Sequence, residues 1–243
     1  MISLAAVSPA DQRVVDIPTR PHVTQRFLLL TPEKPRAAVI LLAGGDGMIG
    51  IAPDGTIGRD SNFLVRTRGM FERHGYAVAV PDMTDSLSRV SKEHAEDLDA
   101  VVVAMQAIAR PVVIIGTSRG SISAANVAAR YQMHGVDALV LTSTVTELAR
   151  REPEEAFDVP LASITIPTLI VHNRNDGCGA APFSGMDRLA KVIPGAQTLA
   201  FTSEEGSSAN PCGPMAPHGY LGIEQQVVDA IANWIDALAA SRK

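Results

Sequence analysis

Hydrophobic positions along the chain follow two periodicities in turn. Short apolar runs rich in β-branched residues and bounded by turn residues are typical of buried strands. They predict eight strands, at Gln12–Ile17, Val23–Leu30, Ala37–Leu42, Tyr76–Val80, Pro111–Ile115, Asp137–Leu141, Pro167–Val171 and Gln197–Thr202. Apolar residues spaced three and four positions apart predict helices between most of these strands. The expected helices are Asn62–His74, Ser91–Ala109, Ile122–Gln132, Pro182–Ile193 and Gly222–Ala240.

This alternation of strands and helices decides the fold class. Strands separated by helices form a largely parallel sheet that is covered by helices on both faces. The sequence therefore predicts an α/β fold with a mostly parallel sheet of about seven or eight strands. No internal repeat or linker divides the chain, so we expect one domain over residues 1–243.

The stretch from Pro111 to Gln132 carries the first chemical motif. A buried strand passes through Gly116-Thr117-Ser118-Arg119-Gly120 directly into an alanine-rich helix. A strand that meets a helix so closely forces the middle residue into a strained turn and exposes its side chain at the strand's carboxyl end. That residue also lies at a helix N-terminus, where N–H groups favour developing negative charge. A G-x-S-x-G alone is common by chance, but this context favours Ser118 as a nucleophile.

Two residues that follow later strands complete a catalytic hypothesis. Functional side chains gather at the carboxyl ends of the strands in such a sheet. Asp176 comes just after one of these strands, and His218 comes after the last strand and a loop. We expect His218 to take the Ser118 proton and Asp176 to hold the imidazole in the required tautomer. His172 also ends a strand, but it shares that strand with the acid and cannot easily reach across.

The glycine-rich loop after the third strand is expected to complete an oxyanion hole. Such a hole needs two backbone N–H donors, and Arg119, which follows the nucleophile, should supply one. Gly45 is the preferred source of the other, with Asp46 second. Gly44, Asp46 and Met48 are expected to line the pocket. Because the Asp46 carboxylate would oppose an oxyanion, we expect it to turn away, toward the Arg119 side chain.

The same loop also suggests a dinucleotide-binding motif. Gly45 to Gly50 reads G-x-G-x-x-G after a strand. A dinucleotide-binding loop turns straight into a helix and is followed by an acidic residue about 20 positions later. Here Ala52–Thr56 follows the loop, and Asp82 comes much later. A nucleotide-dependent oxidoreductase is therefore the weaker alternative, and we expect no cofactor and no metal.

These motifs resemble those of the α/β-hydrolase superfamily, in particular small single-domain serine esterases and dienelactone-hydrolase-like members. The resemblance runs from about Val23 to Ala240. It rests on the Gly116–Gly120 pentapeptide, on Asn175-Asp176 and on Pro217-His218-Gly219. It implies an α/β-hydrolase fold with Ser118, Asp176 and His218 in the order nucleophile, acid and base.

The chain departs from this family pattern at two positions. Ala43-Gly44 stands where the family usually has His-Gly, and Ser118 stands where dienelactone hydrolases carry Cys, which favours ester chemistry.

Family members often insert a cap domain after the strand that precedes Ser143. Only the loop-like stretch Ser143–Ile166 is available here, so we expect little or no cap.

The leading functional hypothesis is a serine hydrolase that cleaves a carboxylic ester through an acyl-enzyme. Thioester, amide or peptide hydrolysis and acyl transfer remain alternatives, because pocket shape rather than triad geometry separates them. A non-catalytic binding module on the same fold is an alternative of another class. The partner is expected to be a small-molecule ester or other acyl compound, and the sequence does not indicate an oligomeric state.

Composition narrows the range of partners. Charged residues make up 19% of the chain and its net charge is −5, which offers no basic patch to nucleic acid. No apolar run approaches the roughly 20 residues that a membrane span needs.

The two cysteines, Cys178 and Cys212, are expected to form a disulfide. If Asp176 and His218 are within hydrogen-bond reach, the loops that carry these cysteines must also meet. A disulfide favours an oxidising compartment, periplasmic or secreted, over a cytoplasmic one. The N-terminal Met1–Ala10 has no basic region and is not a signal peptide as it stands, but it fits the trimmed end of an exported precursor.

Overall fold

All eight predicted strands form one sheet in the computed structural model, which describes residues 11–83, 87–149, 153–203, 206 and 209–241. The Met1–Ala10 stretch lies outside the described residues. The strands are β1 (Asp11–Pro18), β2 (Thr24–Thr31), β3 (Ala37–Leu42), β4 (Tyr76–Asp82), β5 (Val112–Thr117), β6 (Ala138–Thr142), β7 (Thr168–Asn173) and β8 (Gln197–Phe201).

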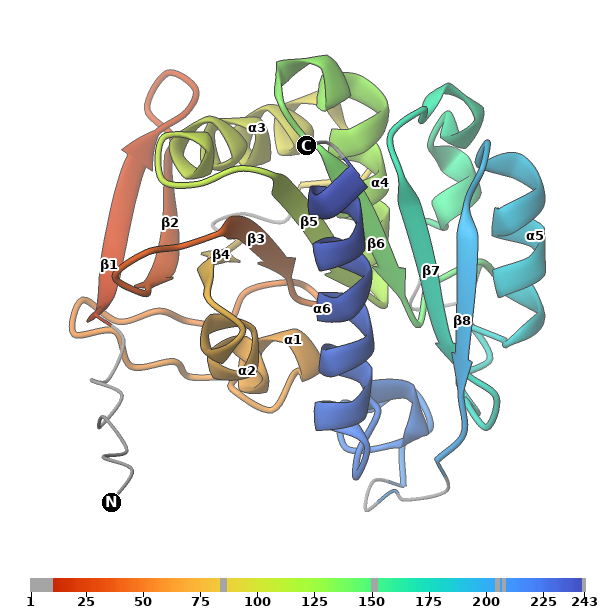
Figure 1. Cartoon of the computed structure of the whole chain (residues 1–243). Coiled ribbons are helices and arrows are strands. Elements are labelled where there is room, and N and C mark those ends of the chain that lie inside the picture. The colour runs from red at the N-terminus through yellow and green to blue at the C-terminus, as the bar shows by residue number, and fades with distance from the viewer. Residues whose placement is uncertain (1–10, 84–86, 150–152, 204–205, 207–208, 242–243) are drawn as a thin grey trace.

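The sheet has the order β1-β2-β4-β3-β5-β6-β7-β8 (Figure 1). β2 pairs antiparallel with both β1 and β4, and all other neighbours pair in parallel. The predicted mostly parallel sheet is therefore confirmed. Because β3, β5, β6, β7 and β8 are parallel, the loops that follow them emerge at one edge of the sheet.

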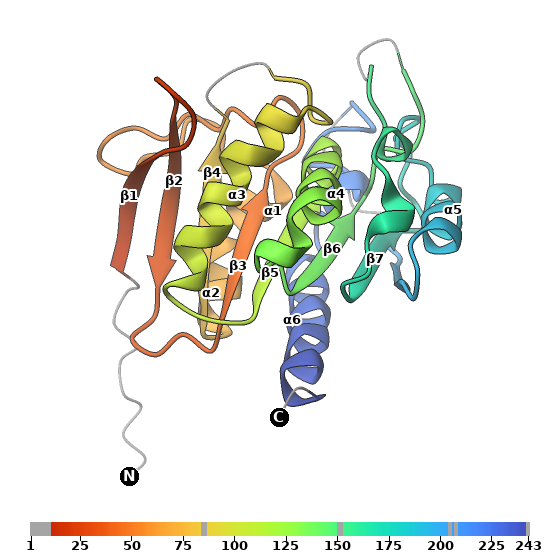
Figure 2. The same cartoon turned by 90° about the horizontal axis from the view of Figure 1, so that it is seen from above.

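Helices cover both faces of this sheet. They are α1 (Phe63–Arg66), α2 (Arg68–Arg73), α3 (Lys92–Gln106), α4 (Arg119–Tyr131), α5 (Ser184–Val192) and α6 (Glu224–Ser241). α6 crosses one face in front of the central strands (Figure 1), and α3 and α4 lie together over the other face (Figure 2). Alternate residues of β5 enter the two cores: Val112 and Ile114 pack on the α3–α4 side, and Val113 and Ile115 pack on the α6 side.

The single helix predicted over Asn62–His74 is wrong, because the segment is broken at Thr67. Thr67 has φ −95° and ψ 1° and separates α1 from α2. Its hydroxyl donates to the carbonyl of Phe63 at 2.8 Å, a local bond that is known to bend helices. With this break, the four-residue helix α1 packs on β3 and β5, and α2 packs on β4.

The described residues that connect β6 and β7 form no cap domain over the carboxyl edge of the sheet. The described part of this connection contains two short 3₁₀ helices, Ala156–Asp158 and Leu161–Ser163. Ala156, Val159, Leu161 and Ile164 are buried in the core, so the segment is held flat against the body. The expectation of little or no cap agrees with this arrangement. No helix among the described residues is long and apolar enough to cross a membrane.

Candidate active site

Ser118 stands at the turn between β5 and α4 with a backbone conformation that L-residues rarely adopt. Its φ is 54° and its ψ is −127°. The two flanking glycines are required by close backbone contacts. A Cβ on Gly116 would lie 2.3 Å from the carbonyl oxygen of Gly120, and a Cβ on Gly120 would lie 2.2 Å from that of Leu42. The sequence around Ser118 therefore permits a strained turn that most residues would prevent.

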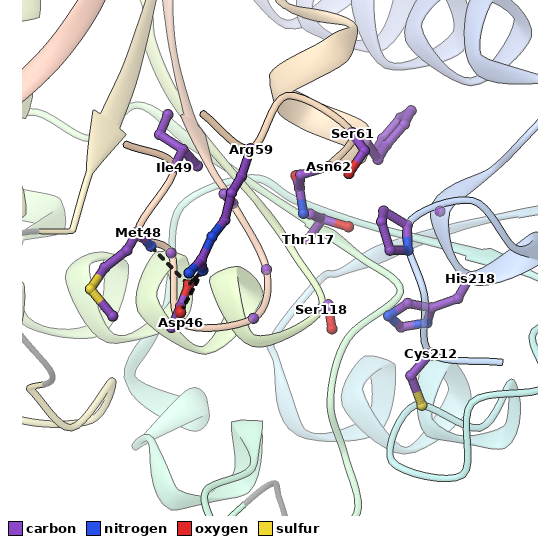
Figure 3. A pocket seen from close by; sticks show the side chains of 17 residues that line it. Asp46, Met48, Ile49, Arg59, Ser61, Asn62, Thr117, Ser118, Cys212 and His218 are labelled. Carbon is purple, nitrogen blue, oxygen red and sulfur yellow. Dashed lines mark hydrogen bonds and ion pairs between the residues drawn. The ribbon is translucent and has the colours of Figure 1, made fainter. Parts of the chain in front are cut away.

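His218 and Asp176 are joined by a direct hydrogen bond. Nδ1 of His218 lies 2.8 Å from Oδ2 of Asp176, and both side chains are almost completely buried. His218 sits in the 3₁₀ helix Pro217–Gly219, whereas Asp176 follows β7. Nε2 of His218 is buried and has no hydrogen-bond partner among the described residues. His218 lines the same pocket as Ser118, and Figure 3 shows the two side chains facing this space.

The environment of Asp176 keeps its carboxyl group ionised. Burial by itself raises the pKa, but hydrogen bonds from His172 and His218 and from the Cys178 N–H outweigh that effect and lower the pKa below its usual range. The Cys178 N–H lies 2.9 Å from Oδ1. An ionised carboxylate can accept from Nδ1–H of His218 and so leaves Nε2 as the basic atom.

A pocket of about 320 Å³ opens beside Ser118. Its walls combine loop glycines, polar side chains and a few apolar groups. They are formed by Ala43, Gly44, Gly45, Asp46, Gly47, Met48, Ile49, Arg59, Ser61, Asn62, Phe63, Thr117, Ser118, Cys212, Pro214, His218 and Gly219. All the residues expected from the sequence to line a pocket are among them. Arg119 is not among the lining residues, and it is the first residue of α4, directly after Ser118.

The backbone of the glycine loop is held in a defined orientation. The Gly47 N–H donates to the carbonyl of Gly44 at 3.2 Å, and the Arg89 guanidinium donates to that of Gly45 at 2.8 Å. Gly45 has φ 63°, which favours glycine, and a Cβ there would meet open space. No described residue accepts a hydrogen bond from the N–H of Gly45 or Asp46. Both N–H groups are therefore available to a ligand.

Solved structures with the same architecture are readily found. Est1E from Butyrivibrio proteoclasticus superposes with a TM-score of 0.68 at 16% identity, over 94% of this chain and 99% of that one. A dienelactone hydrolase from Anabaena variabilis ATCC 29413 gives 0.65 at 16% identity, over 93% and 97%. A proline iminopeptidase from Mycobacterium smegmatis gives 0.68 at 13% identity, over 95% and 100%.

The chain has the α/β-hydrolase fold. No protein-family model matches it, and no curated protein sequence matches it. At these identities the likeness extends to the fold alone, and these neighbours include both a dienelactone hydrolase and a proline iminopeptidase. The reaction of this chain must therefore be argued from its own site.

His172 belongs to the same hydrogen-bonded cluster as Asp176 and His218, a contact that we did not expect from the sequence. Its Nε2 lies 3.2 Å from Oδ2 of Asp176 and 3.0 Å from the carbonyl oxygen of Ala181. A carbonyl oxygen can only accept a hydrogen bond, so Nε2 of His172 carries the proton. His172 therefore also donates to the Asp176 carboxylate. The sequence feature that could have indicated this contact is the position of His172 near the end of β7, four residues before Asp176. Asp176 thus holds two imidazoles, of which only His218 reaches the pocket.

Two further buried polar residues position the loop that carries His218. Asn173 at the end of β7 donates through Nδ2 to the carbonyl of Pro217 at 3.0 Å. Ser143, just beyond β6, donates through Oγ to the carbonyl of His218 itself at 2.8 Å. Both residues lie at the carboxyl ends of buried strands, which is the sequence feature that could have indicated them. They hold the backbone of Pro217 and His218 in place at the carboxyl edge of the sheet.

Arg66, the last residue of α1, holds the loop that carries His218 against the α1 side of the pocket. Its guanidinium donates to the carbonyls of Pro214 at 3.2 Å and Gly219 at 2.5 Å, and it pairs with Glu224 of α6 at 2.9 Å. Arg66 and Glu224 are each less than one-fifth exposed, so this pair is screened by solvent less than a surface pair. Nothing local in the sequence indicated this role, because its partners lie about 150 residues away.

The predicted disulfide between Cys178 and Cys212 is present. The two Cα atoms are 4.5 Å apart, and the residues are separated by 34 positions. Cys178 lies two residues after Asp176 and donates its N–H to that carboxylate, whereas Cys212 lines the pocket on the loop that leads to His218. The bridge therefore joins the loop that carries Asp176 to the loop that carries His218.

Breaking this bridge is expected to lower stability by about 2–4 kcal/mol, because the closed loop restricts the unfolded chain. The measurement is the free energy of unfolding in denaturant for the wild type, with and without reductant, and for Cys178→Ser/Cys212→Ser. The double variant should match the reduced wild type and should not respond to reductant. Full alkylation of both cysteines in unreduced wild type would contradict the prediction.

The expected direction of Asp46 is only partly correct. Its carboxylate does turn away from Ser118, but it pairs with Arg59 at 2.6 Å and accepts from the Met48 N–H at 3.1 Å (Figure 3). It does not pair with Arg119, whose guanidinium instead lies 3.4 Å from Glu154. Arg59 was not considered from the sequence, because it belongs to the irregular segment that precedes α1.

The Asp82 carboxylate holds the second half of the glycine loop. It accepts from the N–H groups of Ile49 at 2.8 Å, Gly50 at 3.2 Å and Ile51 at 2.7 Å. These N–H groups are among those that a dinucleotide phosphate would need, and the next helix begins only at Phe63. The geometry thus disfavours the dinucleotide reading of this loop and gives Asp82, at the end of β4, a positioning role.

Arg89, which holds Gly45, belongs to a buried polar cluster between α3 and α4. Its Nη1 donates to Oγ of Ser123 at 2.9 Å, and Nε2 of His94 lies 2.8 Å from the same oxygen. The Ser123 hydroxyl is then free to donate to His94, which must be neutral to accept. Burial, together with the nearby Arg89 cation, lowers the pKa of His94 to about 3.

This cluster predicts a loss of stability in mild acid. The folded-state pKa of His94 lies below the value of about 6.5 in the unfolded chain, so its contribution is complete above pH 6.5 and is lost as the pH falls toward 3. The expected slope is up to about 1.4 kcal/mol per pH unit. Urea unfolding from pH 7 to pH 4 should show a smaller pH dependence for His94→Gln than for the wild type. Identical slopes would mean that other groups cause the loss.

Proposed function

We propose that this protein is a serine hydrolase that cleaves a carboxylic ester through an acyl-enzyme intermediate. One observation carries the proposal: Asp176 bonds Nδ1 of His218, and the unpartnered Nε2 of that histidine is buried beside the pocket into which Ser118 projects. A base of this kind next to a serine on a strained turn is the arrangement that activates a hydroxyl. The fold of the structural neighbours is compatible with this reading.

The first half of the reaction acylates Ser118. Oγ attacks the carbonyl carbon of the ester, Nε2 of His218 takes the hydroxyl proton, and the carbonyl π electrons move onto oxygen. The N–H groups of Arg119 and Gly45 are the proposed donors to that oxyanion. As the tetrahedral intermediate collapses, the bond to the alcohol breaks and His218 returns the proton to the leaving oxygen.

The second half repeats these steps with water. Nε2 of His218 takes a proton from the water that attacks the acyl carbon, and then returns a proton to Oγ of Ser118. Asp176 remains ionised throughout and stabilises the imidazolium, which agrees with its lowered pKa. The products are a carboxylic acid and an alcohol.

The choice of an ester over other acyl substrates rests on the nucleophile and the pocket. A serine nucleophile and a pocket of about 320 Å³ suit a small acyl group. Thioester or amide hydrolysis and acyl transfer would use the same residues and are the competing outcomes. A binding module without catalysis is the alternative of another class.

The test is a panel of p-nitrophenyl esters of increasing acyl length, together with labelling by a fluorophosphonate. We expect hydrolysis of the short esters and covalent label on the tryptic peptide that contains Ser118. Turnover of p-nitroanilides or acyl thioesters in place of esters would redirect the proposal within acyl chemistry. Absence of both turnover and label would favour the binding module.

A further inference from the structure

Asn62 lies between the glycine loop and α1, and the oxygen and nitrogen of its side-chain amide have different surroundings. Its Oδ1 accepts from the N–H of Leu64 at 3.2 Å and so caps α1. Because an N–H must meet an oxygen there, this bond fixes the orientation of the amide and decides where Nδ2 points.

Nδ2 of Asn62 lies beside the nucleophile. A Cβ built on Gly44 would be 3.4 Å from this nitrogen, 2.9 Å from Cβ of Ser118 and 3.1 Å from the carbonyl oxygen of Thr117. The absence of a side chain at Gly44 therefore leaves the space between Asn62 and Ser118 open. Asn62 lines the pocket, and Figure 3 shows its amide nitrogen directed toward Thr117 and the side on which Ser118 lies.

No described residue accepts a hydrogen bond from this nitrogen. The amide is held in place through Oδ1, and Nδ2 is a donor that faces the space where an acyl group would be attacked. A donor that is oriented before the reaction stabilises developing charge without a cost of reorganisation.

We propose that Asn62 is a catalytic residue whose Nδ2 donates to the substrate carbonyl oxygen as it becomes an oxyanion. It acts as a third donor, beside the N–H groups of Arg119 and Gly45, and keeps both of its protons throughout. The Ser118 proton still passes to Nε2 of His218 and then to the leaving oxygen. This inference rests on the proposed function and adds a side-chain donor to the same site.

The capping role alone does not require asparagine. Serine and aspartate cap a helix about as well, because the cap needs only an acceptor. Neither places an N–H in the pocket, so the two roles can be separated by substitution at this one position.

The experiment compares Asn62→Ser, Asn62→Asp and Asn62→Ala in the full-length protein, with p-nitrophenyl acetate as substrate and phenylboronic acid as a tetrahedral analogue. All three variants should lose roughly 10²–10³-fold in kcat, with KM little changed. The inhibition constant of the boronic acid should rise with the fall in kcat/KM. Only Asn62→Ala should lose stability, by the amount of a missing helix cap, because serine and aspartate keep the acceptor.

The inference would be overturned if activity depended only on the helix cap. In that case Asn62→Ser and Asn62→Asp would retain wild-type kcat, and Asn62→Ala would not. A rise in KM at constant kcat would overturn it as well, because it would place the donor in ground-state binding. In either case the wild type still hydrolyses the ester and still labels at Ser118. A wild type that does neither would overturn this inference together with the proposed function.

Discussion

Replacing Ser118 with alanine is expected to lower kcat for a short p-nitrophenyl ester by about 10⁴-fold or more. The substitution removes the only atom that forms a bond to the substrate in the proposed reaction. It leaves the flanking glycines and the buried Asp176–His218 pair in place. Residual activity would come from the backbone donors and from binding alone.

The matched control for this variant is Ser163→Ala. Ser163 is an exposed serine in a short 3₁₀ helix, and its hydroxyl bonds only a local carbonyl. We expect it to keep wild-type kinetics and full fluorophosphonate labelling, whereas Ser118→Ala should lose the label completely. Wild-type turnover in Ser118→Ala would remove the serine-hydrolase assignment.

The second large effect is expected for Asp176→Asn, which should lower kcat by about 10³–10⁴-fold with the fold retained. The carboxylate accepts from three donors: Nδ1 of His218, Nε2 of His172 and the N–H of Cys178. An asparagine that kept its oxygen toward Cys178 would turn an NH₂ group toward His218. The imidazole would then carry its proton on Nε2 and could not act as a base toward Ser118.

His172→Gln separates the contribution of the acid from that of the residue behind it. Glutamine can still donate to Asp176, so the expected fall in kcat is much smaller than for Asp176→Asn. Circular dichroism and the Cys178–Cys212 bond, mapped by mass spectrometry, check that each variant is folded. A nearly silent Asp176→Asn would move the acid elsewhere, with Asp187 and Glu147 as the next candidates, although Glu147 pairs with Arg188 at the surface.

Much of the fold could be predicted because it depends on local patterns. The central strands β3 to β7 are short apolar runs that are buried on both faces, and the alternate side chains of β5 enter two separate cores. The parallel order of the strands then brings residues after β5, β7 and β8 to one edge of the sheet. This topology is why Ser118, Asp176 and His218, and with them the Cys178–Cys212 bridge, could be chosen from their positions in the chain.

The tertiary structure alone decided which polar groups support that site. His172 bonds Asp176, Arg66 bonds the loop of His218, and Asp82 holds the glycine loop, through contacts that depend on how the loops close over the sheet. Loop side chains follow no periodicity, and the apolar pattern that supported one helix over Asn62–His74 did not indicate the break at Thr67. Periodicity reports which face of an element is buried, whereas hydrogen-bond partners are chosen by proximity between segments far apart in sequence.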